Sequence, residues 1–200
     1  MVFLFLSLLP LLSCKKGKMG EDYYPMGIGS VWNYESSVIK ESATSIDTIQ
    51  KGTTKVKAEK KYKLDTGEDC IFFTLISTVT IPGETTYTAT SGYIAREHNN
   101  YILLYGSPDD TEPDTILALP LEKDKAWQVN PYFTAKVIGQ EDVTVKAGTY
   151  KNSWKIEVIG GPAPAMTTYS WYANGIGKVK EYSELFGYIY SSELVSATIR

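Results

Sequence analysis

The stretch Thr54-Lys55-Val56-Lys57-Ala58-Glu59-Lys60-Lys61-Tyr62-Lys63-Leu64 alternates apolar and charged side chains. Four apolar residues share one parity, namely Val56, Ala58, Tyr62 and Leu64. The other parity is charged: Lys55, Lys57, Glu59, Lys61 and Lys63. Because successive side chains of a strand point to opposite faces, this pattern predicts a half-exposed β-strand whose lysine face meets water.

The same alternation recurs along the chain, and no window of a dozen residues shows a helical stripe. It predicts about ten further strands: Val31–Lys40, Cys70–Ile81, Thr85–Thr90, Tyr101–Tyr105, Phe133–Ile138, Asp142–Val145, Trp154–Ile159, Thr167–Tyr172, Lys178–Tyr182 and Tyr188–Ile199. Short turns separate many of them, such as Asp65-Thr66-Gly67 and Pro82-Gly83, and Ser107–Pro113 reads as the clearest long loop. Strands joined by short turns pair antiparallel. We therefore expect an all-β protein with a single, mostly antiparallel sheet curved into a half-barrel or barrel.

The composition is that of an ordinary globular protein with many aromatic residues. The chain has 200 residues, including 15 Tyr and 4 Trp, and aromatic residues favour the pleated surface of a sheet. Its net charge of -3 supplies no positive field for phosphates. We expect no nucleic-acid partner.

The amino-terminal segment resembles an export signal. Met1–Ser13 is uncharged and apolar, and it is shorter than the roughly 20 residues that a membrane-spanning helix needs. Leu11-Leu12-Ser13-Cys14 closely resembles the bacterial lipobox, in which the cysteine thiol is acylated before cleavage. Signal peptides normally begin with a positive region, which is missing here, and a start codon assigned too far downstream would account for that.

These motifs predict three parts of the chain. Residues 1–13 are the lipoprotein signal peptide, 14–22 a flexible tether after the lipidated Cys14, and 23–200 a single β domain. Each buried methylene contributes about 0.8 kcal/mol, so a multiply acylated cysteine anchors the protein to a membrane without spanning it. The predicted location is the bacterial cell envelope. Lys15 and Lys16 are not the aspartate that retains some lipoproteins in the inner membrane, which favours the outer membrane, facing the periplasm or the exterior.

Acylation of Cys14 would leave Cys70 without a disulfide partner. Cys70 begins an apolar run that ends at Ile76, which is typical of a core strand. We expect a buried, inert thiol.

Motifs that could support catalysis or metal binding are weak. The GIG segments at Gly27–Gly29 and Gly175–Gly177 each precede an alternating strand and lack the third glycine of a dinucleotide-binding loop. His98, the one histidine, falls at a predicted hairpin tip, so a metalloenzyme or a Ser-His-Asp hydrolase would have to be built around it. An acidic cluster could hold calcium, but its spacing departs from that of an EF-hand and fits a solvated turn: Asp109, Asp110, Glu112 and Asp114. We expect no catalytic residue, no metal and no cofactor.

Aromatic residues are the most suggestive remaining feature. Trp and Tyr can line an apolar or sugar-binding pocket, and in a large sheet they also form the core. The candidate pocket aromatics are Trp32, Trp127, Trp154 and Trp171.

Three segments occur in a familiar order: Tyr23–Trp32 (YYPMGIGSVW), Val143–Tyr150 (VTVKAGTY) and Trp171–Lys180 (WYANGIGKVK). They resemble a family of uncharacterised bacterial lipoproteins, and the resemblance covers essentially the whole mature chain. It implies an antiparallel sheet curved around an interior, like periplasmic lipoprotein-handling and lipid-binding half-barrels, and it transfers no catalytic residue. Lys146 and Asn174 stand where the family usually has proline, and both fall at turns.

The function expected from these observations is non-catalytic. The leading hypothesis is a binding module whose curved sheet accepts an apolar or amphipathic ligand such as a lipid. The alternative is a structural or assembly subunit of an envelope protein complex, and a hydrolase is the third hypothesis. A large apolar cavity would favour the first, and a filled core with an exposed apolar patch would favour the second.

Overall fold

The computed structural model describes residues 21–42, 44–161 and 166–200, and all regular secondary structure in these ranges is β-strand. No helix long and apolar enough to cross a membrane occurs among them. The strands are β1 Val31–Glu41, β2 Ile46–Lys63, β3 Asp69–Thr80, β4 Tyr87–His98, β5 Tyr101–Tyr105, β6 Asp114–Ala118, β7 Ala126–Asn130, β8 Phe133–Val145, β9 Gly148–Gly160, β10 Met166–Ala173, β11 Gly177–Leu185 and β12 Tyr188–Thr198.

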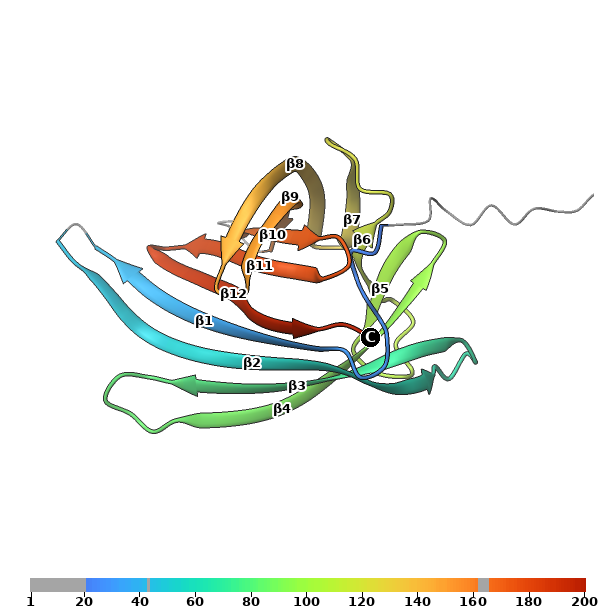
Figure 1. The fold of residues 1–200 in the computed structure, drawn as a ribbon, viewed down its shortest axis with the longest axis horizontal. Coiled ribbons are helices and arrows are strands. Elements are labelled where there is room, and N and C mark those ends of the chain that lie inside the picture. The colour runs from blue at the N-terminus through green and yellow to red at the C-terminus, as the bar shows by residue number, and fades with distance from the viewer. Residues whose placement is uncertain (1–20, 43, 162–165) are drawn as a thin grey trace, which may run out of the picture.

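The twelve strands form one antiparallel sheet in the order β6-β5-β4-β3-β2-β1-β12-β11-β10-β9-β8-β7. Nearly every strand pairs with its sequence neighbours, and β1 also pairs with β12. The sheet curls until its two edge strands, β6 and β7, lie next to each other, as Figure 1 shows. No hydrogen-bonded ladder joins these two strands, so the fold is a nearly closed barrel with one unsealed seam. The predicted fold class is confirmed.

Side chains bridge the seam where the backbone does not. The indole Nε1 of Trp127 on β7 donates to the Thr115 carbonyl oxygen on β6 at 2.9 Å. Asn130 Nδ2 on β7 donates to Asp114 Oδ1 on β6, also at 2.9 Å. Such bonds satisfy part of the polar edge that an unpaired strand presents.

Two strands were missed by the sequence pattern. β6 and β7 have five residues each and are bounded by prolines, which favour loops: Pro113 and Pro120 stand on either side of β6, and Pro131 follows β7. Two predicted strands, Phe133–Ile138 and Asp142–Val145, are parts of one long β8. Register irregularities after Val137 and after Glu141 interrupt its alternation, which explains the apparent break.

A bulge in β2 overturns the expectation that Val56, Ala58, Tyr62 and Leu64 share one face. The register with β3 shifts between Ala58 and Lys60, so one extra residue is inserted. Because the side-chain period is two, this insertion reverses the faces of all later residues. Val56 and Ala58 pack with the barrel's central core, whereas Tyr62 and Leu64 join a separate cluster around Cys70, Ile94 and Tyr105.

The β8–β9 hairpin bends back over the outside of the sheet, as the curling strands in Figure 1 show. Ala147 N donates to the Leu194 carbonyl oxygen on β12 at 3.0 Å, and Lys146 forms an ion pair with Glu35 on β1. Since Tyr34 faces the barrel interior, its neighbour Glu35 points outward. The hairpin therefore covers the outer face.

The two GIG segments meet at one end of the barrel. Trp32 Nε1 donates to the Ile176 carbonyl oxygen at 2.6 Å, and a side chain on Gly177 would contact the Pro25 ring. A Cβ on Gly27 would lie 1.6 Å from the Arg200 carbonyl oxygen. Only glycine therefore allows this segment to approach Arg200 so closely. Together with Tyr23 and its neighbours, these segments close this end of the barrel.

Candidate functional site

The barrel interior contains a cavity of about 510 Å³, large enough for a small organic ligand. One end of the interior is packed by a core that includes Tyr23, Leu117, Trp127 and Ile156. The cavity lies beside this core, and nearly every strand contributes to its wall. Its position follows from the topology, because a curled sheet turns one face of every strand inward.

Aromatic rings form the floor of the cavity next to the amino-terminal segment. The Phe73 and Tyr93 rings stack with centroids 4.9 Å apart, and Tyr24 meets Phe73 edge-on at 6.1 Å. The Tyr24 hydroxyl donates to the Tyr93 hydroxyl oxygen at 2.9 Å. Trp32 lies against Phe73 with centroids 6.2 Å apart. These rings hold one another in place and give the cavity a defined floor.

The walls of the cavity differ in chemistry. The cavity-lining strands at the seam contribute only aliphatic side chains, which form the aliphatic wall: Leu104 from β5, Ile116 from β6 and Val129 from β7. The strands β10–β12 contribute no aliphatic side chain. The polar wall consists of Thr168, Ser170 and Tyr172 from β10, Lys178 and Glu181 from β11, and Tyr190 and Ser192 from β12. Since β11 and β12 lie near the middle of the strand order and the seam lies between its edges, their polar side chains face the aliphatic wall. The aliphatic side chains of β9, Ile156 and Val158, lie directly beside Ser170 and Thr168 of β10.

Lys178 and Glu181 form an ion pair on the polar wall. They are the only residues with formal charge among those described as lining the cavity. Protein surrounds Lys178, yet 37% of its side-chain surface is accessible, because it faces the cavity. Ser170 Oγ also donates to Glu181 Oε2, at 3.4 Å.

Electrostatics keep the Lys178 ammonium charged. Burial alone would lower its pKa, but the Glu181 carboxylate and the nearby Tyr172 and Tyr34 hydroxyls outweigh burial, and the Lys178 pKa is raised. Burial raises the pKa of Tyr172 to about 12, and it raises that of Tyr34 above the ordinary value. The cavity therefore presents an ammonium–carboxylate pair beside neutral phenols at physiological pH.

The four predicted pocket tryptophans are not brought together. Trp32 lines the cavity. Trp127 and Trp154 pack in the core beside it, where Trp154 Nε1 donates to the Tyr23 hydroxyl at 3.1 Å. Trp171 lies on the outer face under the β8–β9 hairpin, and its Nε1 donates to Glu141 Oε1 at 2.5 Å.

Sequence reasoning missed Lys178 and Glu181. With a period of two, Lys178 and Lys180 should share the outer face. However, the register with β10 shifts so that Lys178 lies opposite Tyr172 and Lys180 opposite Trp171. Tyr172 and Trp171 are consecutive and point to opposite faces, so Lys178 points inward and Lys180 outward. A bulge of this kind leaves no clear signal in one sequence.

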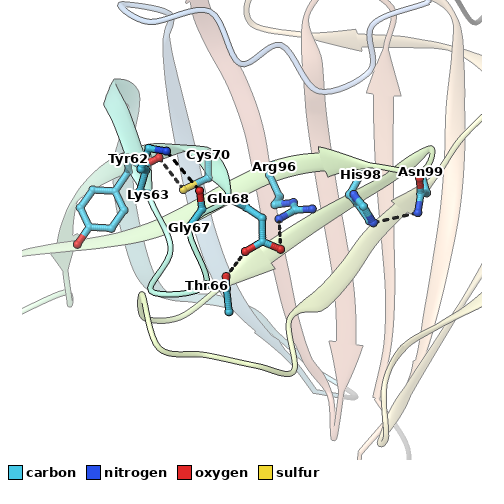
Figure 2. A network of polar contacts seen from close by, with 9 residues as sticks. All are labelled: Tyr62, Lys63, Thr66, Gly67, Glu68, Cys70, Arg96, His98 and Asn99. Atoms are coloured by element: carbon cyan, nitrogen blue, oxygen red, sulfur yellow. Dashed lines mark hydrogen bonds and ion pairs between the residues drawn. The ribbon is translucent and has the colours of Figure 1, made fainter. Parts of the chain in front are cut away.

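His98, Cys70 and Asp110 lie outside the cavity, the first two in the region shown in Figure 2 and Asp110 in the β5–β6 loop. Arg96 Nη1 is 2.9 Å from Glu68 Oε1, and His98 shares a hydrogen bond with the Asn99 amide at 2.9 Å. Cys70 is buried, as expected, and its thiol donates to the Tyr62 carbonyl oxygen at 3.2 Å. In the loop, Asp110 accepts hydrogen bonds from the backbone amides of Gly106 and Glu112, and among described residues no three His, Cys, Asp or Glu side chains converge on one point.

Comparisons with known proteins give a fold match and no family. No family model matches the chain, and no curated protein matches it. A crystal structure described as that of a lipoprotein from Parabacteroides distasonis aligns with a TM-score of 0.50 at 13% identity, covering 90% of this chain and 99% of that one. A beta-barrel-like protein of a domain of unknown function from Brucella abortus aligns with a TM-score of 0.46 at 7% identity, covering 88% and 100%. The first likeness extends over nearly the whole chain and supports the curled-sheet fold.

Proposed function

We propose that this protein is a non-catalytic binding module of the bacterial envelope that holds an apolar or amphipathic ligand inside the barrel. The cavity of about 510 Å³ between an aliphatic wall and a polar wall is the observation that carries the proposal. Ligand pockets of this size are mostly apolar, with a few placed polar groups that fix orientation. Leu104, Ile116 and Val129 supply the apolar contact, and the Lys178–Glu181 pair supplies the polar contact.

The amino-terminal motif suggests where the module works. Cys14 lies outside the described residues and remains the predicted site of acylation, while the Parabacteroides distasonis structure is itself described as a lipoprotein. Acylation of Cys14 would anchor the protein in a membrane, and we favour the outer membrane. The anchor would hold the barrel at a membrane surface where amphipathic ligands are available. The alternative, an assembly subunit with a filled core, receives no comparable support because the core is not filled.

A matched pair of substitutions on β9 tests the proposal. Val158 lines the cavity, whereas its neighbour Ile159 is exposed on the opposite face. The full chain carrying Cys14→Ser, which prevents acylation, would be titrated with the neutral lipophilic dye Nile red. Val158→Trp places an indole in the cavity and should weaken binding about tenfold or more, equivalent to about 1.4 kcal/mol.

Ile159→Trp adds the same indole on the outside and should leave dye binding unchanged. Equal affinities for the two variants, or no binding by the parent chain, would contradict the proposed function. Thermal unfolding of each variant would establish that both remain folded.

A further inference from the structure

We infer that the cavity selects an amphipathic ligand whose head group is hydroxylated and carries no net charge, such as a monoacylglycerol, over an anionic lipid such as a free fatty acid. This inference rests on the proposed function and specifies the chemistry of its ligand. It follows from three features of the polar wall: its hydroxyl content, its charge balance and its position opposite the aliphatic wall.

Hydroxyl groups dominate the polar wall. Thr168 and Ser170 on β10 and Tyr190 and Ser192 on β12 all line the cavity, and each hydroxyl can both donate and accept a hydrogen bond. A ligand hydroxyl has the same dual capacity. It can therefore satisfy such a wall in many orientations, whereas a carboxylate can only accept.

The charge balance of the cavity opposes a ligand anion. The Lys178 ammonium is already neutralised by Glu181, and no other formally charged residue is described on the lining. An added carboxylate would leave one uncompensated negative charge beside Glu181, on a lining that offers no second positive side chain, which is unfavourable. A neutral hydroxyl can instead accept from Lys178 or donate to Glu181, and charge-assisted hydrogen bonds of this kind are stronger than those between neutral groups.

The opposed walls fix the orientation of the ligand. The aliphatic wall flanks the seam, and the ion pair lies on β11, remote from both sheet edges in the strand order. An acyl chain against Leu104 and Ile116 places its head group across the cavity, next to Lys178 and Glu181.

Displacement of Nile red by three probes with the same number of carbon atoms in the hydrocarbon chain tests the inference. The probes are monolaurin, laurate and dodecane, used at neutral pH with the full chain carrying Cys14→Ser. We expect monolaurin to displace the dye at a concentration about tenfold lower than laurate. Equal or stronger displacement by laurate would overturn the head-group inference and leave the proposed function intact.

Glu181→Gln sharpens the test, because it removes the compensating negative charge and leaves Lys178 positive. The laurate affinity should then rise about tenfold, reducing or reversing the preference. The matched control is Glu193→Gln on the outer face, where Glu193 Oε1 is paired with Lys180 Nζ at 2.9 Å.

The control should change neither affinity. An unchanged laurate-to-monolaurin ratio in Glu181→Gln would overturn the role assigned to the ion pair. Displacement by none of the three probes, including dodecane, would instead count against the proposed function itself.

Discussion

The indole Nε1 of Trp127 donates a hydrogen bond to the Thr115 carbonyl oxygen at 2.9 Å, across the seam between β7 and β6. No backbone ladder joins these strands, so side-chain bonds of this kind and core packing hold the barrel closed along the seam. Trp127 is 9% exposed and packs in the core with Leu117 of β6. The Trp127 ring and its Nε1 group therefore both stabilise the contact between β7 and β6.

Trp127→Phe keeps an aromatic ring and removes the donor. The Thr115 carbonyl oxygen loses its partner, so the free energy of unfolding should fall by about 1–2 kcal/mol. Backbone amides of β6 and β7 should exchange with solvent faster than in the parent chain, as measured by hydrogen–deuterium exchange.

Trp171→Phe is the control for this effect. It also removes an indole donor, but that donor reaches Glu141 on the outer face and not the seam. If both variants accelerate exchange at β6 and β7 to the same extent, the bond to Thr115 has no special role in closing the barrel.

Deletion of Glu59 tests the bulge in β2. The extra residue between Ala58 and Lys60 sends Tyr62 and Leu64 to the cluster that covers Cys70, which is only 5% exposed. Removing it should turn the following side chains to the other face or disrupt their packing. In the chain carrying Cys14→Ser, Cys70 should then react with an aromatic disulfide reagent about tenfold faster under native conditions.

Glu59→Gln keeps the bulge and changes only an exposed charge, whose ion pair with Lys57 contributes little to stability. Cys70 should stay protected in this variant. An equally slow thiol reaction in the deletion variant would show that the bulge does not set the faces of β2.

The bulge in β2 is an example of what the sequence could not predict. The period of two predicted the all-β class and most strands, because each half-buried strand carries that signal locally. It did not predict which face Tyr62 or Lys178 occupies, since a one-residue bulge reverses the faces without altering the local composition. Of the tryptophans proposed for the pocket, Trp32 lines the cavity, whereas Trp171 is covered by the β8–β9 hairpin, a long-range contact with no sequence signature.

Alkaline pH should destabilise the barrel through Tyr172. Burial raises its pKa from 10.0 to about 12, so the unfolded chain loses this proton first as the pH rises. The stabilisation is fully present below pH 10 and is lost as the pH rises through about 12. Chemical denaturation across this range should therefore show a steeper decline for the parent chain than for Tyr172→Phe.

Tyr132→Phe is the matched control, because the Tyr132 ring is 76% exposed and its hydroxyl is not buried on folding. This variant should retain the steep decline of the parent chain. Parallel stability curves for the parent and Tyr172→Phe would contradict the burial of the Tyr172 hydroxyl in the cavity wall.

Cys14 can be tested as the membrane anchor independently of the fold. The wild-type chain should incorporate labelled palmitate in a bacterial host and sediment with membranes, because acylation adds about 0.8 kcal/mol of membrane affinity per buried methylene. Cys14→Ser should lose the label and the membrane association, whereas Cys70→Ser should retain both. Incorporation of labelled palmitate into Cys14→Ser would show that another residue is acylated.

Native mass spectrometry tests the central claim, that the barrel holds a ligand, most directly. The full chain carrying Cys14→Ser would be purified from a bacterial envelope extract, alone and with Val158→Trp or Ile159→Trp. We predict a one-to-one adduct with a small amphipathic molecule on the parent chain and on Ile159→Trp, and its loss from Val158→Trp, whose side chain enters the cavity. Recovery of the parent chain without a small-molecule adduct, together with a reproducible protein partner, would contradict the account.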